Sequence, residues 1–69
     1  MNVKLIAIKS PSGACRFLGK TGTLNINNGT FMFVADNGTF FNGNIVSKKL
    51  SHTAIEIETE NNIFTFEIL

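Results

Sequence analysis

Residues 23–41 read TLNINNGTFMFVADNGTFF, and this stretch decides the fold. It contains the tetrapeptide Asn-Gly-Thr-Phe twice, each time between residues that favour extended chain. Asn-Gly between alternating apolar residues is the strongest short-range signal for a β-hairpin, because a type I′ turn needs positive φ at both central positions. The two copies therefore predict a three-stranded antiparallel meander.

The first of these turns fixes which residues face each other. A two-residue loop at 28–29 pairs Leu24 with Phe33 and Ile26 with Phe31. Side chains alternate between the two faces of a strand, so these four residues share one face. We expect that face to be core.

The second turn, treated in the same way, adds a third strand. A two-residue loop at 37–38 pairs Ala35 with Phe40 and Val34 with Phe41, which places Phe40 in the core. The opposite face then carries an apolar cluster that consists of Met32, Val34 and Phe41. Either other strands of the chain cover this cluster, or it is a surface for a partner or for self-association, because soluble monomers rarely expose large apolar patches.

The remaining patterns predict a strand at 3–9, a turn at 10–13, a strand at 14–18 with Phe17 or Cys15 inward, a break at 19–22 and turns at 42–44 and 61–62. Residues 45–53 fit neither helical nor strand spacing. They predict a strand followed by a loop, with a single helical turn at 47–51 as the alternative.

The last hairpin joins strands 54–60 and 63–69. A two-residue loop pairs Ile57 with Phe66 and Ile55 with Ile68, which packs well. The same register places Glu56 opposite Glu67, an unfavourable pair of like charges. Either a lysine of the neighbouring strand, Lys48 or Lys49, lies between them, or the register differs.

Six or seven strands in 69 residues predict an all-β fold, a small antiparallel barrel or sandwich that forms a single domain over residues 1–69. The expected core consists of Leu5, Phe17, Leu24, Ile26, Phe31, Phe33, Phe40, Ile55, Ile57, Phe64, Phe66 and Ile68.

Composition excludes several classes of function. Cys15 is the only cysteine, so neither an internal disulfide nor a two-cysteine metal motif is available, and we expect no metal and no cofactor. A net charge of +1 gives no field that would recruit nucleic acid or an anionic membrane. Residues 1–35 carry +4 and residues 36–69 carry −3. These halves either neutralise each other in the sheet or form a dipolar surface for a charged partner.

No stretch resembles a targeting signal. The longest apolar run near the start, residues 5–8, is too short for a signal-peptide core or for membrane insertion. We therefore expect a cytoplasmic protein with a reduced Cys15.

The residue types that carry catalysis do not form a recognisable set in this sequence. Gly19-Lys20-Thr21 resembles the end of a phosphate-binding loop, but the spacing from Gly13 is wrong and a strand follows instead of a helix. Cys15, His52 and Asp36 are the only candidates for a nucleophile, base and orienting acid, and the chain contains one residue of each type. Their joint presence carries little weight, because a lone cysteine in an apolar strand is usually a small buried hydrophobe. We expect no enzymatic activity.

Part of the chain resembles bacterial pleckstrin-homology-like and GRAM domains. The similar segments are Gly22-Thr23-Leu24-Asn25-Ile26, Phe31-Met32-Phe33, Ile55-Glu56-Ile57-Glu58-Thr59 and Phe64-Thr65-Phe66. This chain is shorter and lacks the C-terminal helix that covers one end of the barrel in those families. The resemblance implies binding of a lipid headgroup or a protein, and it assigns no site residues here.

Elimination favours a protein that acts by contact. We expect a non-catalytic binding protein that occupies a surface of a protein partner, as a small phage or bacterial inhibitor or adaptor does. The alternative is a homo-oligomer that binds a small ligand or lipid in pockets between subunits. The expected contact residues are Met32, Val34, Phe41, Lys48, Lys49, Glu56 and Glu58.

Overall fold

The structure is a computed structural model that describes residues 1–9 and 16–69. It confirms the all-β prediction, with one antiparallel seven-stranded sheet in the order β4-β3-β2-β1-β7-β6-β5. The strands are β1 Asn2–Lys9, β2 Thr21–Asn27, β3 Thr30–Ala35, β4 Phe40–Asn44, β5 Ser47–Leu50, β6 Ala54–Glu58 and β7 Ile63–Ile68. The predicted turn at 10–13 and Cys15 lie outside the described residues.

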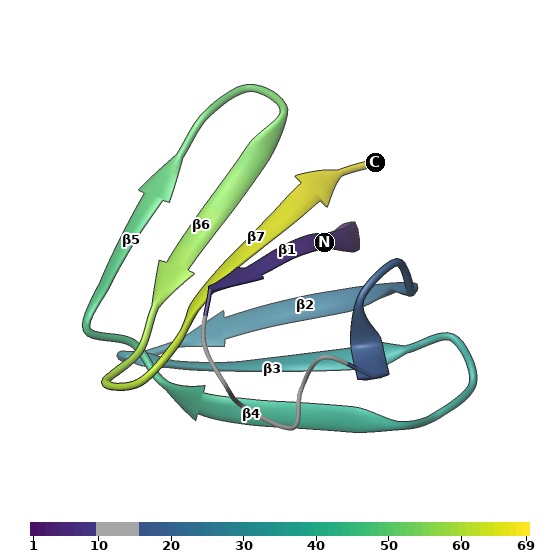
Figure 1. Ribbon diagram of the computed structural model, residues 1–69, viewed down its shortest axis with the longest axis horizontal. Coiled ribbons are helices and arrows are strands. Elements are labelled where there is room, and N and C mark those ends of the chain that lie inside the picture. Colours follow the sequence, from purple (N-terminus) through teal and green to yellow (C-terminus); the bar gives the residue numbers. More distant parts are fainter. Residues whose placement is uncertain (10–15) are drawn as a thin grey trace.

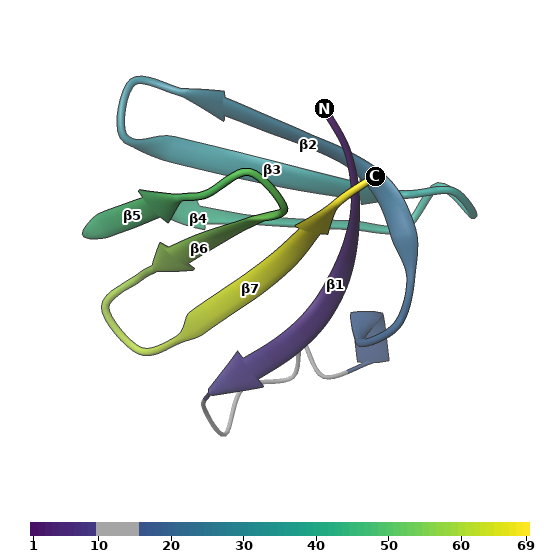
Figure 2. The same cartoon turned by 90° about the horizontal axis from the view of Figure 1, so that it is seen from above.

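The sheet bends so that its two ends face each other (Figure 1). Strands β2, β3 and β4 form one half, and β5, β6 and β7 form the other. Between them β1 pairs with β2 near its start and with β7 along its length, and the register shifts between Leu5 and Ala7. A β-bulge of this kind bends its strand. Seen from above, β1 curves between the two halves (Figure 2).

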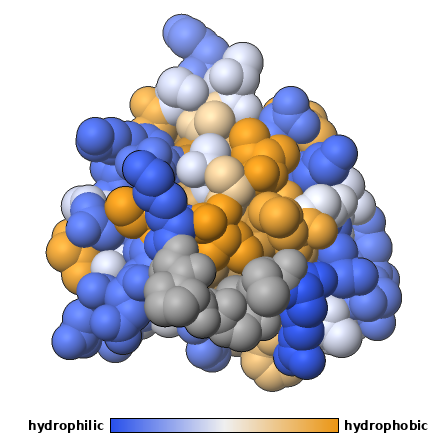
Figure 3. Space-filling view, in the orientation of Figure 1, coloured by the Kyte–Doolittle hydropathy of each residue, from blue (hydrophilic) through white to orange (hydrophobic). Residues whose placement is uncertain are grey.

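The core fills the space between the two halves. Rings from opposite halves meet there, with centroids 5.3 Å apart for Phe33 and Phe66 and 5.7 Å apart for Phe31 and Phe64. Apolar residues gather in the middle of the face shown in Figure 3, and hydrophilic residues surround them. Of the expected core, Leu5, Phe17, Leu24, Phe31, Phe33, Ile55, Ile57, Phe64 and Phe66 are buried, together with Val3 and Ala35. Ile26 and Ile68 are half-buried, and Phe40 is exposed.

The first hairpin has the predicted register. Leu24 lies opposite Phe33, and Ile26 lies opposite Phe31. Asn28 and Gly29 both have positive φ, at 47° and 81°, as a type I′ turn requires. This turn therefore sets the faces of β2 and β3.

The second hairpin is one residue out of the predicted register. Val34 lies opposite Phe40 and Phe33 opposite Phe41, because the turn contains an extra residue. The Gly38 N–H donates to the Ala35 carbonyl (2.9 Å), and Gly38 takes a φ of 91°, which is the geometry of a type I turn followed by a bulge. A shift of one residue exchanges the faces of a strand. The prediction that Phe40 is core and Phe41 lies behind the sheet was therefore wrong.

The segment before β2 also differs. Arg16 and Phe17 lie in a 3₁₀ turn, so the described part of the predicted strand 14–18 is not a strand, although Phe17 is buried as expected. The predicted break at 19–22 ends early, because β2 starts at Thr21. Gly22 is a buried strand residue whose missing Cβ leaves room for the Val34 carbonyl oxygen of β3.

Residues 42–44, predicted as a turn, belong to β4, and the strand β5 occupies part of 45–53 in place of the alternative helical turn. Ile45 and Val46 carry the chain from one edge of the sheet to the other. The Ile45 N–H donates to the Gly29 carbonyl (2.6 Å), and the Val46 N–H donates to the Glu58 carbonyl (2.7 Å). Among the described residues, no strand pairing joins β4 to β5.

The last hairpin is shifted by two residues from the prediction. Ile57 lies opposite Phe64 and Ile55 opposite Phe66, because the two-residue turn lies one residue earlier than predicted, between Thr59 and Asn62. The loop is closed by the Thr59 N–H, which donates to the Asn62 carbonyl (2.8 Å). A shift of two residues keeps each side chain on its face. The like-charge problem is removed, since Glu56 faces Thr65 instead of a second carboxylate.

Candidate functional site

The two halves of the sheet present different surfaces to the outside. On β2, β3 and β4 the residues that point away from the core form three rows across the strands. These rows are Thr23–Val34–Phe40, Asn25–Met32–Asn42 and Asn27–Thr30–Asn44. We call this surface the amide face. None of these described residues is charged. The charged residues Lys4 and Asp36 lie beyond the corners of the face.

The outward surface of the other half has mixed charge. Lys49 lies opposite Glu56 across β5 and β6, and Lys4 of the basic half of the chain lies opposite Glu67 of the acidic half. The Ser47 hydroxyl donates to Glu58 Oε1 (3.0 Å). Alternating opposite charges on a solvated sheet face stabilise it by small amounts and discourage aggregation. These two roles in the fold explain the charges on this surface without a binding partner.

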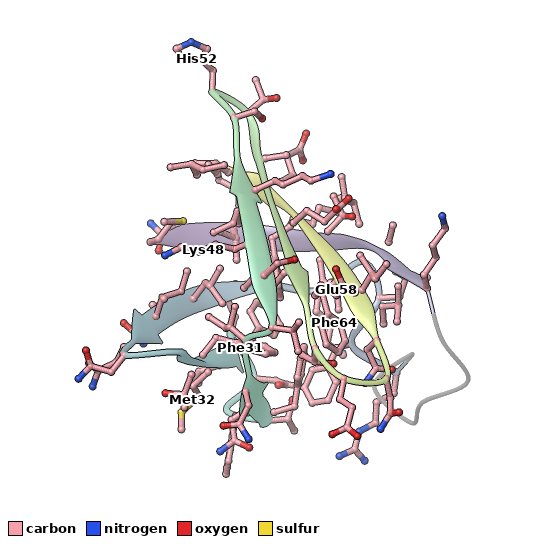
Figure 4. The ribbon with its side chains drawn as sticks, turned by 90° about the vertical axis from the view of Figure 1, so that its left-hand side faces the viewer. Phe31, Met32, Lys48, His52, Glu58 and Phe64 are labelled. Atoms are coloured by element: carbon pink, nitrogen blue, oxygen red, sulfur yellow. The ribbon has the colours of Figure 1, made fainter. Side chains whose placement is uncertain are left out.

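The amide face is hollowed, with a cavity volume of about 520 Å³. Side chains from β2 and β4 stand on its two sides and those of β3 lie between them. Of the described residues, the lining comprises Asn25, Asn27, Thr30, Phe31, Met32, Asn42, Gly43 and Asn44. Phe31 and Gly43 contribute from beneath, because the Phe31 ring points into the core while Met32 points away from it (Figure 4).

An apolar strip borders this hollow. Phe40 is 56% exposed and Met32 is 37% exposed, while Val34 between them is half-buried. Phe40 lies directly opposite Val34 on the neighbouring strand. A large aromatic side chain more than half exposed on an uncharged face is the kind of residue that anchors a binding partner.

The structure divides the predicted contact residues into separate groups. Met32 and Val34 lie on the amide face as expected. Phe41 does not, because its ring packs against Phe17 at 4.8 Å and against Phe64 at 5.0 Å. The predicted apolar cluster therefore contains Phe40 in its place.

The predicted charged contact residues lie on the other half of the sheet. Lys49 and Glu56 face each other on its outward surface, with Glu58 beside Ser47. Lys48 belongs to the edge strand β5 and lies opposite the buried Ile57 of β6. Lysines on an edge strand prevent pairing with other chains, which explains their presence without a partner.

Sequence reasoning missed the asparagines. From the sequence, Asn25 and Asn27 have no assigned role, and Asn42 and Asn44 fall in the predicted turn at 42–44. The signal that was available is the spacing of each pair by two residues, which puts both members on one face of a strand.

Of the residues considered for catalysis, Cys15 lies outside the described residues, and His52 and Asp36 lie in different hairpins. His52 is exposed at the tip of the β5–β6 hairpin (Figure 4). Asp36 lies in the β3–β4 turn, where its Oδ2 accepts a hydrogen bond from the Thr21 hydroxyl (2.5 Å). Within residues 1–9 and 16–69, no group of His, Cys, Asp and Glu could hold a metal ion. The same part of the chain contains no helix with the length and apolar character needed to cross a membrane.

Comparisons with known proteins give no relative for this chain. No protein-family model, no curated protein and no solved structure matches it. The resemblance to pleckstrin-homology-like and GRAM domains stays a prediction.

Proposed function

We propose that this chain is a non-catalytic binding protein that acts by occupying a surface of a protein partner with its amide face. The observation that carries the proposal is the contrast between the two outward surfaces. One is laced with opposite charges, and the other is uncharged, hollowed and bordered by the exposed ring of Phe40. Protein interfaces are depleted of charge at their centre and enriched in aromatic residues and methionine.

A small inhibitor or adaptor is the class of protein that fits this surface. Such a protein needs no catalytic group, and it needs one face that is costly to leave in water. Phe40 and Met32 supply the apolar area, and the surrounding amides supply hydrogen bonds that a partner must satisfy. Burial of the Phe40 and Met32 side chains contributes about 25 cal/mol for each Å² of apolar surface, against which the entropic cost of association is set.

Photo-cross-linking in cells that express the protein tests this proposal. A benzoylphenylalanine replaces Phe40 in one variant and Lys49 in a matched control, since both positions are exposed and point outward from opposite halves. We expect an adduct with another protein from position 40 and none from position 49. Urea unfolding of both variants checks that the fold is intact.

Three results would overturn the proposal. Position 40 could give no adduct, both positions could give the same adducts, or the adduct from position 40 could contain two copies of this chain. The last result would favour a homo-oligomer that binds a small ligand or lipid between its subunits.

A further inference from the structure

The asparagines of the amide face have a regular arrangement. Asn25 and Asn27 lie two residues apart on β2, and Asn42 and Asn44 lie two residues apart on β4. Residues at this spacing on a strand are about 6.6–6.8 Å apart, and two strands separated by a third are about 9.5 Å apart. The four amides therefore stand at the corners of a rectangle around Met32 and Thr30.

The short side of this rectangle, which runs along the strands, matches the repeat of an extended peptide. In extended chain, the backbone groups on one side recur every second residue, at the same spacing of about 6.6–6.8 Å. A primary amide carries both donors and an acceptor, so one asparagine can pair with the N–H or the C=O of a peptide group. Asn25 and Asn27 could thus contact successive peptide groups on one side of a segment, and Asn42 and Asn44 could do so on the other.

The floor of the hollow fits a varied segment. Met32 is flexible and polarizable and adapts to different side chains. The Thr30 hydroxyl donates to the Asn27 carbonyl (2.7 Å), which fixes the Thr30 side chain between the asparagines of β2 and those of β4. Since no described residue of the lining is charged, a charged side chain in the hollow would lose its water without gaining a partner, which is costly.

We infer that the hollow of the amide face binds an extended, uncharged peptide segment of the partner, held through its backbone by Asn25, Asn27, Asn42 and Asn44. The segment runs along the strands, and an apolar side chain near one end lies against Phe40 and Val34. This inference rests on the proposed function and names the part of the partner that the face recognises. The width of the face, about 10 Å between the outer strands, suits one extended chain better than a flat domain surface.

Selection from a displayed library tests the inference. The probe is a set of random peptides of about seven residues, which span roughly 23 Å when extended. Peptides enriched on the wild-type protein are synthesised, and their affinities are measured by fluorescence polarisation. We expect Asn25→Ala/Asn42→Ala to weaken binding by about tenfold or more, and Lys49→Ala/Glu56→Ala to leave it within about twofold.

A second measurement asks whether the backbone is what the asparagines recognise. Each peptide N–H is replaced in turn by N-methyl. We expect weaker binding at every second position, because only alternate peptide groups face the same side. Both double variants are checked by urea unfolding, since substitutions at exposed strand positions change stability by only about 0.5 kcal/mol.

Several outcomes would overturn the inference. They are a library that yields no binder, binders unaffected by the asparagine substitutions, and an N-methyl effect that does not alternate. An alternating effect without dependence on the asparagines would indicate pairing with a strand edge instead. Asparagine-dependent binding of oligosaccharides on a glycan array, without peptide binding, would assign the hollow to sugars.

The two proposals can fail separately. If the cross-link from position 40 captures a protein and the asparagine substitutions do not affect that capture, the proposed function stands and the peptide inference is wrong. If position 40 captures no protein, the proposed function itself fails.

Discussion

The ring of Phe41 holds the two halves of the sheet together, so its removal is the most informative test of the fold. Its centroid lies 4.8 Å from that of Phe17, 5.0 Å from Phe64, 5.6 Å from Phe33 and 5.9 Å from Phe31. Truncation of a packed phenylalanine to alanine costs about 3–5 kcal/mol. Phe41 is half-buried, so we expect the lower end, about 3 kcal/mol for Phe41→Ala.

The matched variant is Phe40→Ala, at the next residue along β4. Phe40 is 56% exposed, and we expect its truncation to change the free energy of unfolding by no more than about 0.5 kcal/mol. A domain of this size has a total stability of only about 3.5–10 kcal/mol. Phe41→Ala therefore removes a large fraction of it.

Urea unfolding followed by circular dichroism measures both variants. With an m-value of about 1–1.5 kcal/mol per M, the midpoint falls by roughly 2–3 M for Phe41→Ala and by less than about 0.5 M for Phe40→Ala. Equal or reversed effects would refute the register of β3 and β4. Asn42 and Asn44 would then point into the core, and the amide face would not exist.

Three further predictions concern the rest of the sheet. Gly22→Ala brings a Cβ into the Val34 carbonyl oxygen, and we expect the free energy of unfolding in urea to fall by about 3 kcal/mol; an unchanged midpoint would contradict the close approach of β2 and β3. Lys49→Glu places a second carboxylate opposite Glu56, and we expect the free energy of unfolding to fall by about 0.2–1 kcal/mol, and by less in high salt; a fall that high salt leaves unchanged would argue against this pair. Lys48→Val/Lys49→Val removes the charges from the edge strand β5, and we expect faster growth of light scattering on storage than in wild type; equal growth would mean that the lysines do not protect this edge.

The same tetrapeptide forms two different turns, and this explains how far sequence reasoning reached. Asn28 adopts positive φ and gives the type I′ turn that the pattern predicts. In the second copy, Asn37 Oδ1 accepts from the N–H of Thr39 (3.0 Å) and from its hydroxyl (2.6 Å), and Gly38 alone takes the left-handed conformation. The residues before each Asn-Gly do not reveal which of the two turns forms. One extra loop residue was enough to exchange Phe40 and Phe41.

An error of two residues has a different consequence. The β6–β7 hairpin was predicted in the wrong register, yet Ile55, Ile57, Phe64 and Phe66 are all buried as expected. The hydrophobic alternation identifies the face of a strand, whereas the position and length of the turn decide which residues lie opposite each other. The core could therefore be predicted better than the pairing.

The candidate site depended on the part that could not be predicted. Asn42-Gly43-Asn44 has the composition of a turn, but Gly43 lies in β4 opposite Phe31. A Cβ on Gly43 would approach Cε1 of the Phe31 ring to 3.2 Å, so the glycine makes room for packing across the strands. Turn glycines and packing glycines look alike in one sequence. The amide face becomes visible only when β4 is placed beside β3.

The most direct test of the central claim compares the two outward surfaces in one binding experiment. The partner captured through position 40 is titrated calorimetrically with Met32→Lys/Phe40→Lys and with the charge swap Lys49→Glu/Glu56→Lys, after both variants are shown to be folded. If the amide face is the contact surface, the first variant loses about a hundredfold or more in affinity, and the second changes by less than about threefold. Equal affinities for the two variants, or a greater loss from the charge swap, would contradict the claim.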